Sequence, residues 1–202
     1  MRARWPLFIW LVLAIGCGGL MMPLQRQDCP VEPVARATLP KNLSFRARMR
    51  LGIGKEEVSL EVIARSTPEE LVVVGIAPFG MRLFELRQRD QRFMVDSSAS
   101  AEASGLALYA ADALTRAYWI QPPANSYTWD RNGEQITDSL RDGERRRIYR
   151  RLGQPTGSHE ITIDYAGATG PGTAPDARIE NPWCGYRAMI VPFKANHRSS
   201  GS

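Results

Sequence analysis

Hydrophobic and polar residues alternate along several short segments of the chain, which is the pattern of half-buried β-strands. The clearest segment is 43–53, where apolar residues from Leu43 to Ile53 alternate with serine, arginine and glycine. The turns that follow are too short for crossover connections, so neighbouring strands must be antiparallel. The strands predicted in the first half of the chain are 43–53, 58–64, 71–76, 81–87 and 91–96.

One segment in the middle of the chain has the helical period instead. Apolar residues recur at i, i+3, i+4 and i+7 over 106–117, and Ser104 is available as the N-cap. The prolines at 122–123 stop the helix because proline cannot continue it. The polar residues predicted on its opposite face are Asp112, Thr115 and Arg116.

Strand signals then resume and determine the fold class. Asn-Gly at 132–133 and Asp-Gly at 142–143 are typical hairpin turns, and alternation returns over 159–165 and 186–193. A sheet of this size with one apolar face must curl or be covered. The sequence therefore predicts a mainly β domain over 43–193, a curved antiparallel sheet that forms an open, incomplete β-barrel with the α-helix inserted as a lid.

Residues 1–16 have the features of a bacterial lipoprotein signal peptide. Arg2 and Arg4 precede an apolar run without charge. The run ends in Ala-Ile-Gly-Cys at 14–17, which resembles the lipobox whose cysteine is acylated and becomes the new N-terminus. We therefore expect Cys17 to carry the lipid anchor of the mature protein.

The residues that flank the predicted domain suggest a tethered protein. Gly18 stands where an aspartate often signals inner-membrane retention in lipoproteins, so we expect the outer membrane, with the domain facing the periplasm. Residues 17–42 contain four prolines and predict a linker, and 194–202 predict a disordered tail. An uncleaved anchor or simple cleavage is the alternative, because 5–22 is a charge-free run of 18 residues.

The net charge gives little reason to expect a nucleic-acid partner. The 202 residues have a formal charge of +5, and processing after residue 16 removes two arginines, leaving +3. An arginine cluster surrounds one late hairpin, which we interpret as a solvated strand edge, with contact to anionic lipid headgroups as the alternative. The cluster comprises Arg141, Arg145, Arg146, Arg147, Arg150 and Arg151.

No sequence motif points to catalysis, a metal or a cofactor. The chain has two histidines, and it lacks a phosphate loop, a Gly-x-Ser-x-Gly motif and a His-Glu-x-x-His motif. A periplasmic hydrolase is therefore only a weak alternative. An oxidising compartment allows Cys29 and Cys184 to form a disulfide between the linker and the last strand, which is a more plausible role for Cys184 than catalysis.

The lipobox, five-strand meander, central helix and second set of strands together resemble the LolA/LolB-like outer-membrane lipoprotein superfamily. They are still more similar to the uncharacterised short lipoproteins associated with aryl-polyene gene clusters. The sharpest similarity is strand 71–76 and the turn after it. In LolB-like proteins this turn projects a leucine that helps deliver acyl chains to the outer membrane. The resemblance implies a membrane-insertion or transfer loop at Pro78, Phe79 and Gly80.

The resemblance also implies a cavity between sheet and helix that binds or transfers lipid, lipoprotein acyl chains or a related polyene cargo. A periplasmic carrier would then be a partner, and we expect a monomer. Considered without the resemblance, the same side chains would fill an ordinary core, as in a structural or assembly lipoprotein of the envelope. The predicted lining residues are Phe45, Met49, Leu51, Leu60, Val62, Val73, Leu83, Tyr109, Leu114 and Trp119.

We predict that Cys17→Ala prevents acylation, because the thiol is the atom that receives the lipid. Metabolic labelling with a fatty acid should mark the wild-type chain and not the variant, and globomycin should block processing of the wild-type chain. Unchanged processing together with no acyl label on the wild-type chain would contradict a lipoprotein.

Overall fold

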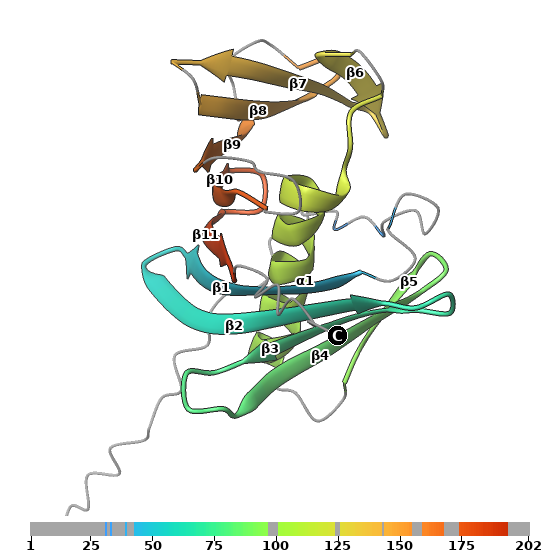
Figure 1. Ribbon diagram of the computed structural model, residues 1–202, viewed down its shortest axis with the longest axis vertical. Helices are drawn as coiled ribbons and strands as arrows, with labels where there is room; N and C mark the ends of the chain where they lie inside the picture. Colours follow the sequence, from blue (N-terminus) through green and yellow to red (C-terminus); the bar gives the residue numbers. More distant parts are fainter. Residues whose placement is uncertain are drawn as a thin grey trace, which may run out of the picture.

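The computed structural model describes residues 43–96, 101–123, 126–142, 144–154, 159–167 and 174–193, together with residues 31, 33 and 39 (Figure 1). The predicted signal peptide at 1–16, Cys17, Cys29 and the tail at 194–202 lie outside the described residues. The strands are β1 (Ser44–Ile53), β2 (Glu56–Ser66), β3 (Leu71–Ile76), β4 (Arg82–Arg89), β5 (Arg92–Val95), β6 (Thr128–Arg131), β7 (Glu134–Arg141), β8 (Glu144–Arg151), β9 (Ile161–Ala166), β10 (Asp176–Asn181) and β11 (Tyr186–Pro192).

The eleven strands of the described residues belong to one antiparallel sheet, in the order β5-β4-β3-β2-β1-β11-β10-β9-β8-β7-β6. Each half of the chain forms a meander, and the pairing of β1 with β11 joins the two halves. The sheet is not closed, because β5 and β6 form its two edges. The predicted mainly β class and open antiparallel sheet are therefore confirmed. Strand β10 has no counterpart among the segments predicted individually.

The helix connects the two edges of the sheet. It consists of α1 (Ala101–Leu114) and a π-helical segment, Thr115–Trp119, and Figure 1 shows it running along the inner side of the curved sheet. Eleven strands laid flat would span about 48 Å, whereas nineteen helical residues cover about 28 Å. Curling of the sheet brings its edges within reach of this short connection.

The predicted alternation determines which side chains face the helix. Along β1, Ala47, Met49 and Leu51 are buried, whereas the intervening arginines are exposed. Buried side chains from the strands between the two edges join those of the helix in one core, and Phe93, Val95 and Trp129 of the edge strands pack against it. The helix begins three residues before Ser104, so Ser104 lies inside the helix and is not its N-cap.

The register of the sheet shifts between Gly75 and Ile76, where β3 pairs with β4. The ring of Phe84 occupies the space above Gly75, and a Cβ atom at that position would lie 2.3 Å from the ring. A glycine inside a strand often marks such an irregularity. The shift lies directly before the turn that contains Phe79.

Candidate functional site

The C-terminal end of the helix lies inside the sheet. The π-turn closes with a 3.0 Å hydrogen bond from the Ile120 amide to the Thr115 carbonyl. The last carbonyls of a helix lack intrahelical donors and need other partners when they are buried. Three side chains of the sheet supply these partners, and π-turns of this kind are frequent at functional sites.

Arg147 and Tyr149 of β8 both donate to the carbonyl of Arg116, at 3.0 and 2.8 Å. Arg147 also donates to the Ile120 carbonyl at 2.7 Å. Tyr165 of β9 donates to the Ala117 carbonyl at 2.8 Å, and burial raises the pKa of the Tyr165 hydroxyl, which therefore remains a donor. The end of the helix is thus held by hydrogen bonds to two adjacent strands.

A buried ionic cluster lies on the side of the helix that the sequence pattern predicts to be polar. Asp112 and Arg116 are 3% and 5% exposed, and their side chains pair at 3.0 Å. Arg116 also pairs with Glu134 of β7 at 2.9 Å, while Asn181 and Tyr186 donate to Asp112. Burial would lower the pKa of Arg116, but the Asp112 and Glu134 carboxylates outweigh burial and raise it well above its ordinary value.

A second cluster lies on β7 and β8. The Asp138 carboxylate accepts from Arg147 at 2.7 and 3.0 Å and from Arg145 at 2.5 Å. Burial would raise the pKa of Asp138, but hydrogen bonding to the two guanidinium groups holds that pKa below its ordinary value. Two cations share one carboxylate, so the cluster has an excess positive charge.

The interpretation of the arginine cluster as a solvated edge is wrong for this strand. Strand β8 lies between β7 and β9, and Arg147 is 1% exposed. Arg145, Arg147 and Tyr149 share the inner face, as alternation along a strand requires. The sequence pattern could have indicated this burial. Arg147 lies two residues before the aromatic residue Tyr149, so the two side chains are on the same face of the strand.

A cavity of about 450 Å³ lies beside the π-turn. Ligand pockets typically have volumes of 300–1,000 Å³ and mainly apolar and aromatic linings. The rings of Phe45 and Tyr118 pack with centroids 5.0 Å apart, and the Tyr118 hydroxyl donates to the Pro175 carbonyl at 2.9 Å. The lining residues are Leu43, Phe45, Ala117, Tyr118, Trp119, Gln121, Arg145, Tyr165, Ala174 and Pro175.

The structure places the predicted lining residues in different surroundings. Phe45 and Trp119 line the cavity beside the π-turn. Leu83 is partly buried against the core, and the other seven predicted residues are buried within it. Sequence reasoning missed Tyr118, Tyr165 and Arg145, because the cavity combines the π-turn with residues of β1, β8 and β9, which lie far apart in the sequence. The buried predicted residues are Met49, Leu51, Leu60, Val62, Val73, Tyr109 and Leu114.

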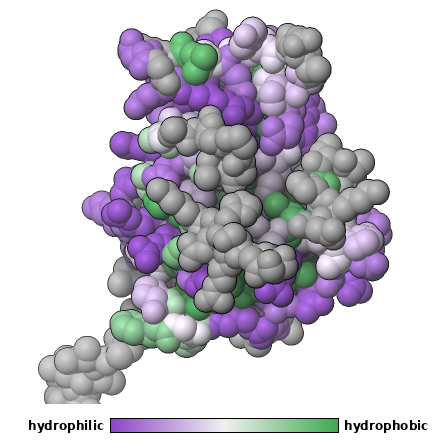
Figure 2. Space-filling model, viewed as in Figure 1, coloured by the Kyte–Doolittle hydropathy of each residue, from purple (hydrophilic) through white to green (hydrophobic). Residues whose placement is uncertain are grey.

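The turn between β3 and β4 carries exposed hydrophobic side chains. Phe79 is 99% exposed and Met81 is 64% exposed. Figure 2 shows hydrophobic colours at the lower left, where Figure 1 places this turn. Pro78 and Gly80, on either side of Phe79, border a hollow of about 700 Å³ on the outer face of the sheet.

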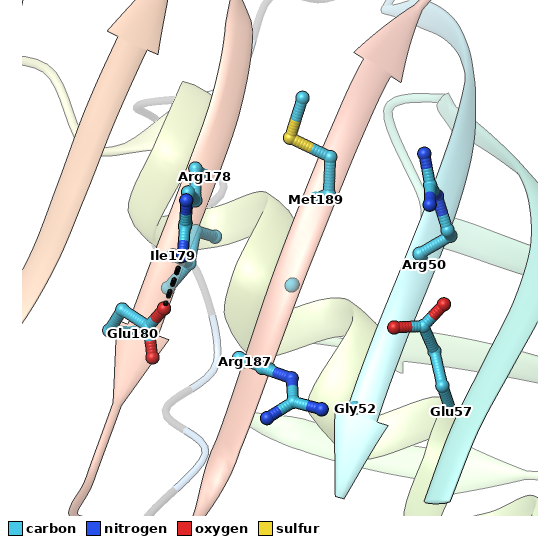
Figure 3. A pocket seen from close by; sticks show the side chains of 9 residues that line it. Arg50, Gly52, Glu57, Arg178, Ile179, Glu180, Arg187 and Met189 are labelled. Carbon is cyan, nitrogen blue, oxygen red and sulfur yellow. Dashed lines mark hydrogen bonds and ion pairs between the residues drawn. The ribbon is translucent and has the colours of Figure 1, made fainter.

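A further hollow of about 310 Å³ lies on the outer face, across β2, β1, β11 and β10 (Figure 3). Arg50 of β1, Arg178 of β10 and Arg187 of β11 border it. The Arg187 side chain lies over Gly52, where a Cβ atom would be 2.7 Å from the Arg187 Nε. This hollow contains acidic residues as well as arginines, so its charge is mixed.

The described residues include no group of three or more histidine, cysteine, aspartate or glutamate residues placed to hold a metal ion. No helix in the described part of the chain is long and apolar enough to cross a membrane. Cys184 is disulfide-bonded and is therefore not a free thiol, while its predicted partner Cys29 lies outside the described residues.

A family model described as "Protein of unknown function (DUF3261)" matches residues 44–194. The chain belongs to the DUF3261 family. The match covers every strand and the helix of the described residues, and it includes all the described residues that line the cavity beside the π-turn except Leu43. No curated protein matches the chain.

We predict that Asp138→Asn destabilises the DUF3261 domain by about 2–4 kcal/mol at pH 7, because it leaves the buried Arg147 without its carboxylate. The pKa of Asp138 is lowered by folding, so its contribution is complete above the ordinary aspartate pKa of about 3.9 and is lost as the pH falls below that value. The gap between wild type and variant in the free energy of unfolding should therefore shrink from pH 7 to pH 3.

Asp164→Asn provides the matched control for urea unfolding. Asp164 lies on β9, is half exposed and pairs with Arg146 at 3.3 Å, so its loss should cost less than about 1 kcal/mol. Equal effects of the two substitutions at pH 7 would contradict a stabilising role for the Asp138 cluster.

Proposed function

We propose that this protein is an outer-membrane lipoprotein that binds a hydrophobic chain in the cavity beside the π-turn. The observation that carries the proposal is the cavity itself, which has ligand size and four aromatic walls, Phe45, Tyr118, Trp119 and Tyr165. Burial of an apolar chain against such walls gives about 25 cal/mol for each Å² removed from water. Binding and release of this kind needs no bond-making chemistry.

The proposal includes the resemblance to LolA/LolB-like proteins, with the helix acting as a lid over the inner face of the sheet. It also includes the lipid anchor at Cys17 and a membrane-insertion or transfer role for the turn at Pro78, Phe79 and Gly80. Two findings support these parts, namely the predicted lipobox and the full exposure of the Phe79 side chain. A large aromatic side chain held in water would gain about 1.5–3 kcal/mol on entering a bilayer.

A structural or assembly lipoprotein is the second candidate function. One observation favours it, since most of the residues expected to line a cavity along the helix are packed in the core. In this alternative the cavity beside the π-turn has no cargo, and the protein works through its outer surface.

Leu43→Trp tests the binding function by placing a larger side chain in the cavity, which Leu43 lines. We expect the wild-type full chain, extracted from membranes, to carry acyl species in native mass spectrometry, and the variant to lose most of them. Leu140→Trp is the matched control, because Leu140 is 76% exposed and outside the cavity. A wild-type chain that is consistently empty would favour the structural role.

Phe79→Glu tests the membrane role of the exposed turn. The substitution removes an aromatic ring that contacts no core residue, so stability should be unchanged while lipid transfer or docking to vesicles weakens several-fold. Tyr127→Glu is the control, because Tyr127 is a 75% exposed aromatic residue at another position. Equal transfer by wild type and Phe79→Glu would refute the role of the turn.

A further inference from the structure

The described part of the wall of the cavity beside the π-turn contains one cation. Arg145 lines the cavity, and its side chain is 37% exposed, whereas that of Arg147 is 1% exposed. The Arg145 guanidinium lies 4.9 Å from the centroid of the Tyr165 ring, which also lines the cavity. The cavity therefore combines aromatic walls with a guanidinium group that a ligand can reach.

Among the described residues, Arg145 shares its one carboxylate partner, Asp138, with Arg147. Arg147 donates to both oxygens of Asp138 through its Nε and Nη2, and its Nη1 donates to the carbonyls of Arg116 and Ile120. Arg145 donates to the same carboxylate through Nη2. A guanidinium group has five N–H donors, and a planar anion can accept two of them at once. The excess charge of the Asp138 cluster thus lies on the arginine that faces the cavity.

We propose that the ligand is an amphiphile with an anionic head, a carboxylate or a phosphate, which Arg145 binds while the apolar chain lies against the aromatic walls. This inference rests on the proposed function, because it specifies the class of molecule that the cavity takes. Strictly neutral chains of equal length bind less tightly.

The test is competition for photolabelling of the detergent-solubilised full chain. The probe is the methyl ester of a diazirine-bearing hexadecanoic acid, which has no charge, and labelled peptides are mapped to the cavity. Hexadecanoate, hexadecyl phosphate and methyl hexadecanoate are the competitors. We expect at least one of the two anions to compete about tenfold better than the ester, and the stronger anion identifies the head as carboxylate or phosphate.

Arg145→Gln should remove most of this preference and leave competition by the ester unchanged, and Arg145→Lys should retain part of it. In the Arg145→Gln variant, Asp138 still accepts both hydrogen bonds from Arg147, so the domain should fold. A thermal melt verifies this. Arg178→Gln is the charge control, since Arg178 lies on the outer face, and should preserve the preference.

Two negative results have different meanings. Labelling of the cavity with equal competition by anions and ester in the wild-type chain would overturn the anionic head and leave the proposed function standing. Absence of probe from the cavity peptides of the wild-type chain would overturn the proposed function itself. A tenfold preference that persists in Arg145→Gln would also overturn the inference.

Discussion

A helix that ends inside a curled sheet cannot give its last carbonyls to water, and this constraint organises the structure around the π-turn. The carbonyls of Arg116, Ala117 and Ile120 take their hydrogen bonds from side chains of β8 and β9. Because an unpaired buried carbonyl costs about 1–3 kcal/mol, the helix and these strands stabilise one another. The same contacts hold the cavity walls at Ala117 and Tyr165 in place.

Arg147 satisfies this constraint in a way that a lysine could not. One edge of its planar guanidinium group, Nε and Nη2, donates to Asp138, while Nη1 donates to the carbonyls of Arg116 and Ile120 at the end of the helix. A lysine ammonium is a compact point charge and lacks this fork of fixed donors. The buried charge is tolerated because every nitrogen of Arg147 has a partner, as buried ions require.

Much of the fold was predictable because the strand pattern has a period of two and most turns are short. The alternation of apolar and polar residues alone placed Met49 and Leu51 on the inner face of β1, and the structure confirms this. The burial of Asp112 and Arg116 was not predictable from the helical period. A polar stripe normally faces solvent, but the sheet curls around this helix and supplies Glu134 and Tyr186 as partners.

The candidate site was predictable only in part, for a related reason. Phe45 and Trp119 carry the apolar character that a cavity wall needs, and they do line the cavity. Arg145 and Tyr165 reach the same cavity from strands far along the chain, and Tyr118 depends on the extra residue of the π-turn. The period of hydrophobic residues predicts one helix or strand at a time. It does not predict a site that forms where several of these elements end.

The cavity beside the π-turn and the hollow bordered by the turn at Phe79 share none of their described lining residues. Substitutions at separate sites without shared partners usually act additively, so we expect the two features to respond to substitution independently. A carrier that moves its cargo into a membrane needs both features, whereas a protein that only stores a ligand needs the cavity alone. An assembly protein needs neither the cavity nor a cation within it, so the charge of Arg145 beside four aromatic rings weighs in favour of binding.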